Sequence, residues 1–489
     1  MDILNEREVV FELENLRCCE IERQWQKRSD CCYNSIVNQM MSPRYSKYRK
    51  VLLLSMFIFL FFIIKQTTIL NDNKQQVNHM NEIEKIQIMC GELCKTSRVG
   101  HSGLFFHKTT GKNIESCSEN VHIISAVAQA KRDLSKIEFV VLNVLDGSKR
   151  TNFDCCIYGD EKLSVYRIKA VVKETYRENR KFADLKARQY QCFVHNIKFQ
   201  MKYIQLVGKK EFCNSSHIRQ PVSYAPVKEN KFAICAKIAY NYLNPLHIIE
   251  WFEYQKMMGV DTVLIALQQI NEDAYAVFKY YEREGIAILI SFPCKLPGNI
   301  DRSFAPDKWH YHQSTHDEQV AVYSCKEILQ GFGFVAIVDL DEYIVNGNFL
   351  KYTDILKSEL LPAFPNAAAF TLRVSFFITD WGVSGVEPLI TSKYIRRSKP
   401  IFSRYKNIYL PNRSATMDTH LVWPMKGYRR IMLRSHNVIL YHYRKCKNSD
   451  NTTDVCMSFS KHSDTKMMKV MFELYDKVVA VKRRCGISA

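Results

Sequence analysis

One short segment constrains the fold more than any other: residues 334–346 form an apolar run that ends abruptly in three carboxylates. The run is short, rich in β-branched residues and bounded by Gly333 and Gly347, so it predicts a buried β-strand. Side chains two residues apart on a strand lie on the same face. We therefore expect Asp339 and Asp341 to project together from the end of this strand.

Two like charges at the end of a buried strand repel each other and are costly to remove from water. A divalent cation such as Mg²⁺ or Mn²⁺ removes that cost, because it binds carboxylate oxygens and keeps positions for water and phosphate. Open α/β sheets also bind ligands just past the carboxyl ends of their strands. The segment predicts a metal–diphosphate site; the alternative is a pair of solvated turn residues, since Asp-x-Asp is common.

The amino-terminal region contains a second apolar run, residues 51–64, followed by Lys65 and a mixed stretch to Leu70. A membrane span needs about 20 residues, so the predicted anchor covers 51–70 with Lys65 snorkelling. Four basic residues precede the run: Arg44, Lys47, Arg49 and Lys50. They place residues 1–50 in the cytosol and the rest in the lumen. The run begins too far from Met1 for a cleaved signal peptide, so we expect a single-pass type II anchor.

Glycosylation signals and cysteines agree with that orientation. The triplets that begin at Asn214, Asn412 and Asn451 are N-glycosylation signals, and all follow the anchor. Of the 17 cysteines, 13 also follow it and would meet an oxidising compartment. Because 13 is odd, at least one is unpaired or pairs between chains, and Cys90 and Cys94 are the candidates for a disulfide-linked homodimer.

The net charge of +19 has two interpretations. Behind a membrane anchor, a basic luminal domain suits anionic donors such as sugar nucleotides or acidic glycans rather than nucleic acid. The alternative is a basic surface that is simply solvated.

The composition and the hydrophobic pattern of the chain change along its length. Residues 71–130 are polar and predict a stem, and residues 131–228 carry short apolar runs between turn signals, which indicate a small β-rich domain. Its last part, 221–226, has prolines at both ends and predicts a linker. Residues 229–446 predict an α/β domain, and 447–489 a carboxyl-terminal extension.

Strands and helices alternate in the α/β region. Strands are predicted over 232–238, 262–267, 286–292 and 334–338, and helices over 246–258, 274–284 and 313–329. Such alternation implies a mostly parallel sheet with right-handed crossovers. Because Gly-x-Gly-x-x-Gly and the P-loop are both absent, a nucleotide bound here would be held through a metal.

An ordered set of motifs in residues 230–446 resembles glycosyltransferase family 92. The set consists of Ile234 to Tyr240, Glu250 to Gln255, Gly259-Val260-Asp261, Gln319-Val320-Ala321, Asp339-Leu340-Asp341-Glu342 and His442-Tyr443-Arg444. The resemblance implies a Rossmann-like GT-A fold with a type II Golgi topology. It also implies transfer of a hexose with inversion onto a glycan acceptor on a glycoprotein or glycolipid. Characterised members of the family transfer galactose from UDP-galactose with a metal, here expected to be Mn²⁺ or Mg²⁺.

The resemblance also implies roles for single residues. Asp341 would ligate the metal, and Asp339 would bind the metal or the donor ribose. The late histidine ligand would be His442, with His420 and His436 as rivals.

Five further residues are candidates around this centre. Glu342 would orient the site, and Lys237 and Arg444 would approach the diphosphate. An inverting transfer needs a carboxylate base, for which Asp380 is the candidate and Glu387 the competitor.

Two alternatives stay open. His312 and His316 are four residues apart on a predicted helix, as in some zinc sites, but no metalloprotease glutamate accompanies them, and we favour a surface or acceptor role. Many members of the family have Asn-Asp-Cys where this chain has Tyr323-Ser324-Cys325. That difference motivates the second function, a non-catalytic glycan-binding or scaffold protein on a transferase fold; a phosphotransferase ranks below both.

Overall fold

The computed structural model describes residues 121–129, 137–147, 152–159, 165–176, 185–194, 197, 199–213, 219–292, 308–434, 438–446, 456–457 and 459–487. These residues all belong to one compact unit, Ile86–Ala489. The predicted cytosolic tail, the membrane anchor and the stem up to residue 120 lie outside them. Within the described ranges, no helix combines the length and apolarity needed to cross a membrane.

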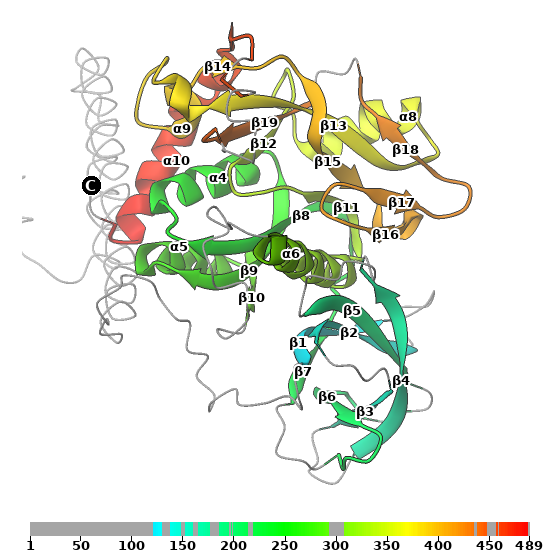
Figure 1. The fold of residues 1–489 in the computed structure, drawn as a ribbon. Coiled ribbons are helices and arrows are strands. Elements are labelled where there is room, and N and C mark those ends of the chain that lie inside the picture. Colours follow the sequence, from blue (N-terminus) through cyan, green and yellow to red (C-terminus); the bar gives the residue numbers. More distant parts are fainter. Residues whose placement is uncertain are drawn as a thin grey trace, which may run out of the picture. The chain divides into compact units, whose positions relative to one another are not determined.

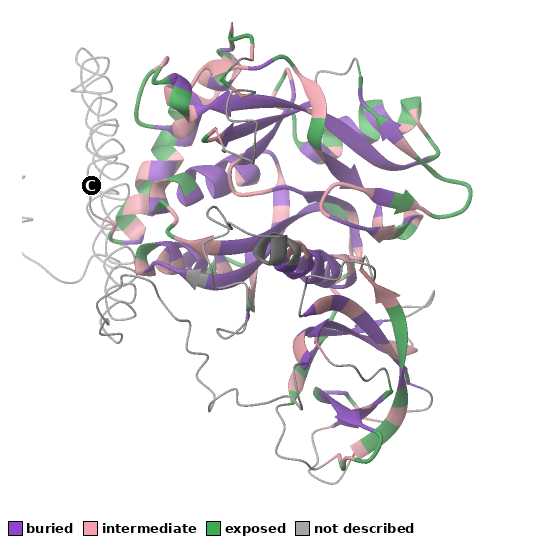
Figure 2. Cartoon of the chain, viewed as in Figure 1, coloured by how far each residue is buried: buried purple, intermediate pink, exposed green. Residues whose placement is uncertain are grey.

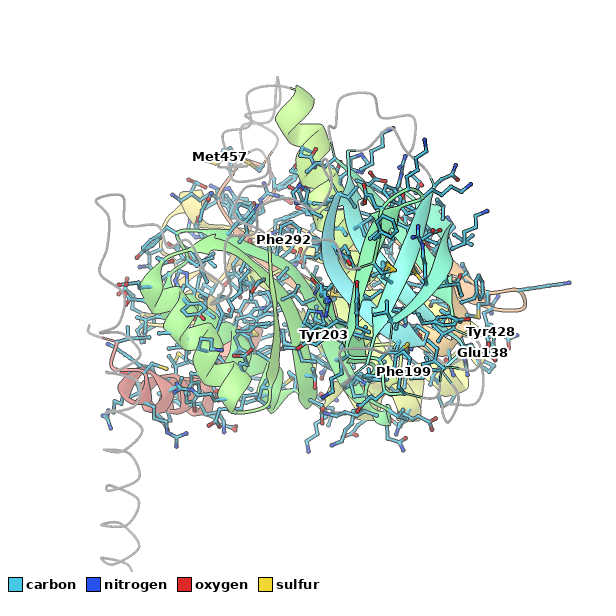
Figure 3. The ribbon with its side chains drawn as sticks, turned by 90° about the horizontal axis from the view of Figure 1, so that it is seen from below. Glu138, Phe199, Tyr203, Phe292, Tyr428 and Met457 are labelled. Atoms are coloured by element: carbon cyan, nitrogen blue, oxygen red, sulfur yellow. A yellow bond between two sulfur atoms is a disulfide. The ribbon has the colours of Figure 1, made fainter. Side chains whose placement is uncertain are left out.

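Seven strands form a closed barrel, seen at the lower right of Figure 1. They run in the order β1-β2-β5-β4-β3-β6-β7, and β7 closes the barrel by pairing parallel to β1. Buried side chains such as Leu142, Ile157 and Tyr190 fill its core, against which Phe199 packs just before β6 (Figure 3). The bounds are β1 Val121–Gln129, β2 Phe139–Asp146, β3 Phe153–Tyr158, β4 Val165–Thr175, β5 Lys186–Phe193, β6 Tyr203–Gly208 and β7 Gln220–Tyr224.

The barrel corrects two sequence-based boundaries. Residues 121–129, expected at the end of the stem, form β1, and most of the expected linker 221–226 forms β7. Polar residues made β1 look like stem, but Ser125 and Gln129 are buried and bonded to the helix outside the barrel. Pro221 is tolerated in β7 because closing the barrel needs only part of that strand's backbone hydrogen bonds.

The strand–helix alternation predicted for residues 232–338 is confirmed. Strands β8 (Lys228–Asn241), β9 (Val260–Ile270), β10 (Ala287–Ser291) and β11 (Phe332–Ile337) are parallel, in the order β10-β9-β8-β11. They are joined by α4 (Pro245–Met257), α5 (Glu272–Arg283) and α6 (Lys308–Ile328). Because the chain order reverses between β8 and β11, their carboxyl ends flank a topological switch point, where α/β sheets bind ligands.

The rest of the sheet is mixed, which corrects the expectation of a mostly parallel sheet. Beyond β11 the order continues β15-β13-β19-β12, with β18 beside β13, and both β15 and β12 are antiparallel to their neighbours. The bounds are β12 Glu342–Val345, β13 Ala367–Ile378, β15 Ile401–Tyr409, β18 Arg429–Met432 and β19 Ile439–Arg444. Because β13 and β19 run parallel to each other, their carboxyl ends lie at one edge.

Alternating side chains bury both faces of the parallel strands (Figure 2). On β8, Phe232 and Ile234 pack in the cluster that contains α4 and α5 residues, whereas Ala233 and Cys235 pack in the cluster that contains α6 residues. Helix α6 therefore covers one face of the sheet while its other side contacts β1, β2 and β5 of the barrel (Figure 1).

Two glycines are required by close backbone approaches or turns. Gly259 follows α4 with φ +81°, the left-handed conformation that ends many helices. A Cβ at Gly333, on β11, would lie 1.9 Å from the carbonyl oxygen of Glu229 on β8, so only glycine allows the two strands to pair.

The predicted carboxyl-terminal extension, 447–489, is partly a core element. Helix α10 (Met471–Arg484) packs against α4 through Leu474, Val478 and Val481, which are buried in the same cluster as α4. Its charged residues hid this apolar stripe, which recurs at helical spacing. The extension therefore completes the α/β domain.

Four disulfides join described cysteines: Cys155–Cys192 and Cys156–Cys213 in the barrel, Cys235–Cys325 between β8 and α6, and Cys446–Cys456 after β19. Cys90 and Cys94 lie outside the described residues.

Removing the β8–α6 disulfide should destabilise the protein strongly. Cys235 and Cys325 are 90 residues apart, so the paired alanine variant should lose about 4 kcal/mol of unfolding free energy through chain entropy. The matched control removes Cys446–Cys456, whose separation of 10 residues gives about 2–3 kcal/mol. Chemical denaturation of the full-length chain measures both, and equal losses would contradict the expectation.

Candidate active site

Asp339 and Asp341 lie in a tight turn after β11, not on that strand, and Glu342 begins β12. The Glu342 carboxylate accepts a hydrogen bond from the Asp339 N–H at 2.8 Å, and the Glu342 N–H donates to the Asp339 carbonyl at 3.1 Å. The expectation that Asp339 and Asp341 project together from a strand is therefore wrong. The turn gives their side chains different partners.

Asp339 lies between two lysines. Its Oδ1 is 2.9 Å from Lys237 Nζ on β8, and its Oδ2 is 2.9 Å from Lys406 Nζ on β15. Lys237 has φ 54°, a strained conformation at the end of the buried part of β8, and also lies 3.3 Å from Glu318 of α6. Both lysines are almost fully buried, so each depends on this carboxylate for charge compensation.

The mutual stabilisation appears in the pKa values of Asp339 and Lys237. Burial opposes ionisation of Asp339, but the charges of Lys237 and Lys406 outweigh it and lower the pKa of this carboxyl far below its usual range. Burial likewise opposes the charge on Lys237, and Asp339 with Glu318 raises its pKa overall. At neutral pH both Asp339 and Lys237 are therefore charged.

His442 lies between the other two carboxylates. Its Nε2 is 3.3 Å from Asp341 Oδ2, and its Nδ1 is 3.4 Å from Glu342 Oε1. The pairing of β12 with β19 sets this arrangement, because Glu342 and His442 are directly opposite. Glu342 is fully buried, and burial raises the pKa of its carboxyl although Lys406, 3.5 Å away, opposes the rise. Asp341 is 46% exposed and borders solvent.

Two more predicted residues lie at this edge of the sheet. Arg444 ends β19 opposite Ile378, and Asp380 follows β13 in a short 3-10 turn (Thr379–Trp381). The Asp380 carboxylate is exposed and accepts a hydrogen bond from the Cys446 N–H at 2.6 Å. Burial and the nearby Arg404 lower the pKa of Arg444, which also interacts with Asp341. Trp381 is buried and fills core.

Other candidates lie apart from this centre or outside the described residues. Glu387 forms an exposed ion pair with Lys393, and His436 is outside the described ranges. His316 is fully buried against the barrel, where its Nδ1 accepts from the Ala187 N–H at 3.2 Å, so the expected surface role is wrong. His316 is buried because the barrel packs against α6 at this position.

His420 and the predicted sugar-attachment sites complete the list. His420 Nδ1 lies 2.9 Å from the Tyr405 carbonyl, and burial together with Lys406 lowers its pKa, so it stays neutral near the centre. The side chain of His312 is not described. Asn412 is exposed, whereas Asn214 and Asn451 lie outside the described residues.

The Tyr323-Ser324 difference lies on the barrel side of α6. The Ser324 hydroxyl accepts a hydrogen bond from Ser125 of β1 at 2.7 Å, and Tyr323 packs in a cluster with Ile124 and Leu145 of the barrel. The substituted positions therefore leave the acids, lysines and His442 in place. Within the described residues, no group of three His, Cys, Asp or Glu side chains is arranged to hold a metal ion.

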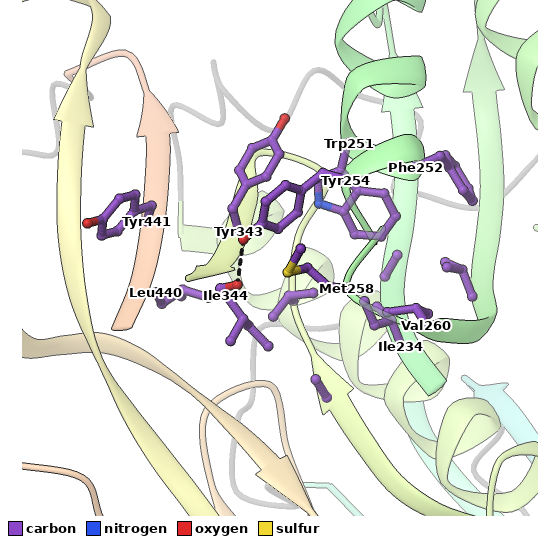
Figure 4. Close-up of a cluster of buried hydrophobic side chains, with 14 of the residues drawn as sticks. Ile234, Trp251, Phe252, Tyr254, Met258, Val260, Tyr343, Ile344, Leu440 and Tyr441 are labelled. Carbon is purple, nitrogen blue, oxygen red and sulfur yellow. Dashed lines mark hydrogen bonds between the residues drawn. The ribbon is translucent and has the colours of Figure 1, made fainter. Parts of the chain in front are cut away.

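Helix α4 connects this centre to the segment after Asp380. Trp251 Nε1 donates to the Glu342 carbonyl at 2.9 Å. The Tyr254 hydroxyl donates to the Ile344 carbonyl, also at 2.9 Å (Figure 4). On the same helix, the Glu250 carboxylate accepts hydrogen bonds from the Ile390 and Thr391 N–H groups and the Thr391 hydroxyl.

Sequence reasoning missed Lys406 and Glu250. No local sequence signal indicates Lys406, because it becomes part of the site only through the pairing of β15 with β11. The signal for Glu250 was its charge within an apolar helix, Trp251 and Phe252 following it directly. A charged residue there needs a specific partner.

Comparison with known proteins identifies the family. The model of glycosyltransferase family 92 matches residues 230–479, just over half of the chain. The protein belongs to glycosyltransferase family 92. The suspected resemblance is thus confirmed, and the match extends past residue 446 to include most of α10. Family membership supports a role in glycosyl transfer.

The other comparisons add little. No curated protein matches the chain. Among solved structures, residues 1–349 of TarS from S. aureus align with 12% identity and a TM-score of 0.23, covering 50% of this chain and 65% of that one. This family 92 chain therefore spans less than two thirds of that structure. At this TM-score the alignment says nothing about its fold.

Removing the buried lysine of β15 should destabilise this family 92 domain. The Lys406→Met variant leaves Glu342 buried without its lysine partner, whereas Asp339 keeps Lys237. We therefore expect the free energy of unfolding to fall by about 3 kcal/mol, the low end of the range for a broken buried ion pair. Thermal unfolding measures the loss. The double variant Lys406→Met/Glu342→Gln should recover part of it, and a wild-type midpoint in Lys406→Met would contradict the role given to this lysine.

The Glu250 carboxyl should make stability depend on pH. Burial raises its pKa from 4.5 to about 7, although the Thr391 and Ile390 hydrogen bonds oppose the rise. Between these values the folded state binds the proton more tightly than the unfolded state does, so the group's stabilising contribution is lost as pH rises.

Relative to Glu250→Gln, the wild-type free energy of unfolding should fall by roughly 2–3 kcal/mol from pH 5 to pH 8. All other titrating groups are common to both proteins and cancel in this difference. A difference that is constant over the range would show that Glu250 ionises normally.

Proposed function

We propose that this protein is a metal-dependent, inverting glycosyltransferase of GT-A type that transfers a hexose, galactose from UDP-galactose, to a glycan acceptor. The observation that carries the proposal is His442, held between Asp341 and Glu342 at the carboxyl edge of the strands. Family membership supports the reaction class.

The residues present fit a divalent cation. A His442 tautomer with its proton on Nδ1, which lies 3.4 Å from Glu342 Oε1, would leave the Nε2 lone pair for a metal on the side of the exposed Asp341. Carboxylate oxygens suit Mn²⁺ or Mg²⁺, and the donor diphosphate would supply further oxygens. When bound, the cation would neutralise the charge that develops on the leaving diphosphate.

The lysine pair serves the donor side of the site. Lys237 and Lys406 keep Asp339 ionised and fix its position, which suits a carboxylate that accepts a hydrogen bond from a donor ribose hydroxyl. Arg444, near Asp341, is the group we assign to the diphosphate, because a guanidinium binds phosphate oxygens in pairs.

Asp380 is the group that we assign to the acceptor. Asp380 follows the end of β13, and a hydrogen bond from the Cys446 N–H orients its exposed carboxylate. In an inverting transfer, the acceptor hydroxyl oxygen bonds to the sugar C1 as the bond to the diphosphate breaks. Asp380 would take the hydroxyl proton in that step.

The cellular setting is part of the proposal. The apolar run 51–70 and its basic flank support a type II Golgi membrane anchor, and the exposed Asn412 is compatible with a luminal body. A disulfide-linked homodimer through Cys90 or Cys94 is consistent with that compartment.

The test is turnover of sugar nucleotides by the full-length chain, measured as release of nucleoside diphosphate with and without Mn²⁺. We expect UDP-galactose to be the preferred donor and the Asp341→Ala variant to lose at least about 100-fold in rate, because one of two protein ligands to the metal is gone. A donor screen that gives no turnover with any divalent metal would overturn the proposal.

The matched control is Asp476→Ala, an exposed aspartate on α10, which should keep the wild-type rate. If wild type shows no turnover and Asp341→Ala binds glycans as tightly as wild type does, the non-catalytic alternative is favoured.

A further inference from the structure

A cleft of about 290 Å³ lies between the barrel and the hairpin formed by β16 (Ser414–Met417) and β17 (Val422–Pro424). The end of β4 forms one wall, with Glu174 and Tyr176, and the hairpin forms the other, with Thr416 and Trp423. The proposed transfer reaction uses none of these side chains.

The hairpin presents an open aromatic surface to the cleft. Thr416 and Trp423 are paired directly across the two strands, so their side chains share a face. Trp423 is 44% exposed, whereas the adjacent Val422 is buried in the core. The hairpin is therefore anchored, and the exposure of the indole is a fixed feature of the cleft wall.

A β-bulge directs the opposite wall toward the hairpin. The register of β4 shifts between Val172 and Glu174, which lets two consecutive side chains reach the α/β domain. Lys173 lies 2.6 Å from Glu327 of α6, and the Glu174 oxygens lie 2.7 and 2.8 Å from the Thr416 hydroxyl. The Tyr323 hydroxyl of α6 also interacts with Glu174. Two hydroxyl protons occupy only part of the acceptor capacity of a carboxylate, so Glu174 can accept further hydrogen bonds.

The same hairpin is bound to the strand that carries Lys406. In its turn, the His420 carbonyl accepts from Asn407 Nδ2 at 2.7 Å, and His420 Nδ1 lies 2.9 Å from the Tyr405 carbonyl. Lys406, between these two contacts, pairs with Asp339. The cleft and the candidate active site are thus joined by a single hairpin.

Helix α6 makes a second connection. Gln319 donates to the Met417 carbonyl of the hairpin at 2.8 Å, while the preceding Glu318 lies 3.3 Å from Lys237. A ligand in the cleft would therefore lie close to the donor site without occupying it.

The chemistry of the lining matches a neutral sugar. A pyranose ring offers an apolar C–H face to an aromatic ring and hydroxyl donors to a carboxylate. The lining residues are Glu174, Thr175, Tyr176, Thr416, Met417, Asp418, Leu421 and Trp423, with two carboxylates and no lysine or arginine. Like-charge repulsion disfavours nucleotides and acidic glycans there.

We propose that this cleft is an acceptor subsite that binds neutral sugars beyond the reacting one, with Trp423 stacked on a ring and Glu174 accepting from its hydroxyls. This assignment rests on the proposed function, since it assigns part of the acceptor to a second surface of the same transferase.

The experiment compares full-length wild type with Trp423→Ala and Glu174→Gln. Acceptors are desialylated N-glycans carrying fucose and galactose, against methyl galactoside and methyl fucoside. We expect the KM for the N-glycans to rise about tenfold in Trp423→Ala, while the KM for the methyl glycosides and donor hydrolysis without acceptor are unchanged. Trp423→Phe should restore most of the affinity, because it keeps an aromatic face.

The matched control is Phe472→Ala, which removes a 75% exposed aromatic side chain from α10 and should change nothing. Calorimetric titration of the N-glycans without donor separates this proposal from the previous one. If wild type binds them through Trp423 yet turns over no donor, the subsite stands and the proposed function fails. If turnover is normal and Trp423→Ala has wild-type KM and affinity, the subsite is overturned.

Discussion

The ion pairs of Asp339 with Lys237 and Lys406 are the interaction on which the rest of the centre depends. Three segments that are far apart in sequence bring one charge each to the switch point of the sheet. Both lysines are buried and share this carboxylate, with Glu318 as a second partner of Lys237 and Glu342 of Lys406. The sharing matters because an unpaired buried charge costs several kcal/mol. The turn after β11 is thereby held in place, and Asp341 is left facing His442 and solvent.

Two helices then connect this cluster to the rest of the molecule. Helix α4 forms hydrogen bonds to the backbone of β12 through Trp251 and to the segment after Asp380 through Glu250. The same helix therefore holds both the donor side and the acceptor side of the proposed active site. Helix α6 contacts Lys237, the hairpin and the barrel. The barrel is therefore a wall of the acceptor cleft in our proposal rather than a spacer, and its β4 bulge is what brings Glu174 to the hairpin.

Much of the parallel half of the sheet was predictable, because each strand is a short apolar run and each helix has clear ends, such as Gly259 after α4. Errors arose where local polarity conflicted with burial. The polar residues Ser125 and Gln129 favour a stem where the structure has β1, and the charges of α10 favour an extension outside the core. Only contacts with other elements explain why these segments are buried.

The sequence alone determined that an acidic turn follows a buried strand, that a late histidine accompanies it, and that the whole resembles family 92. The tertiary structure decided which acid does what: Asp339 pairs with lysines, while Asp341 and Glu342 flank His442. The reason is that strand pairing sets which side chains meet, and pairing joins residues whose separation along the chain carries no local signal. Lys406 could enter the site only in that way.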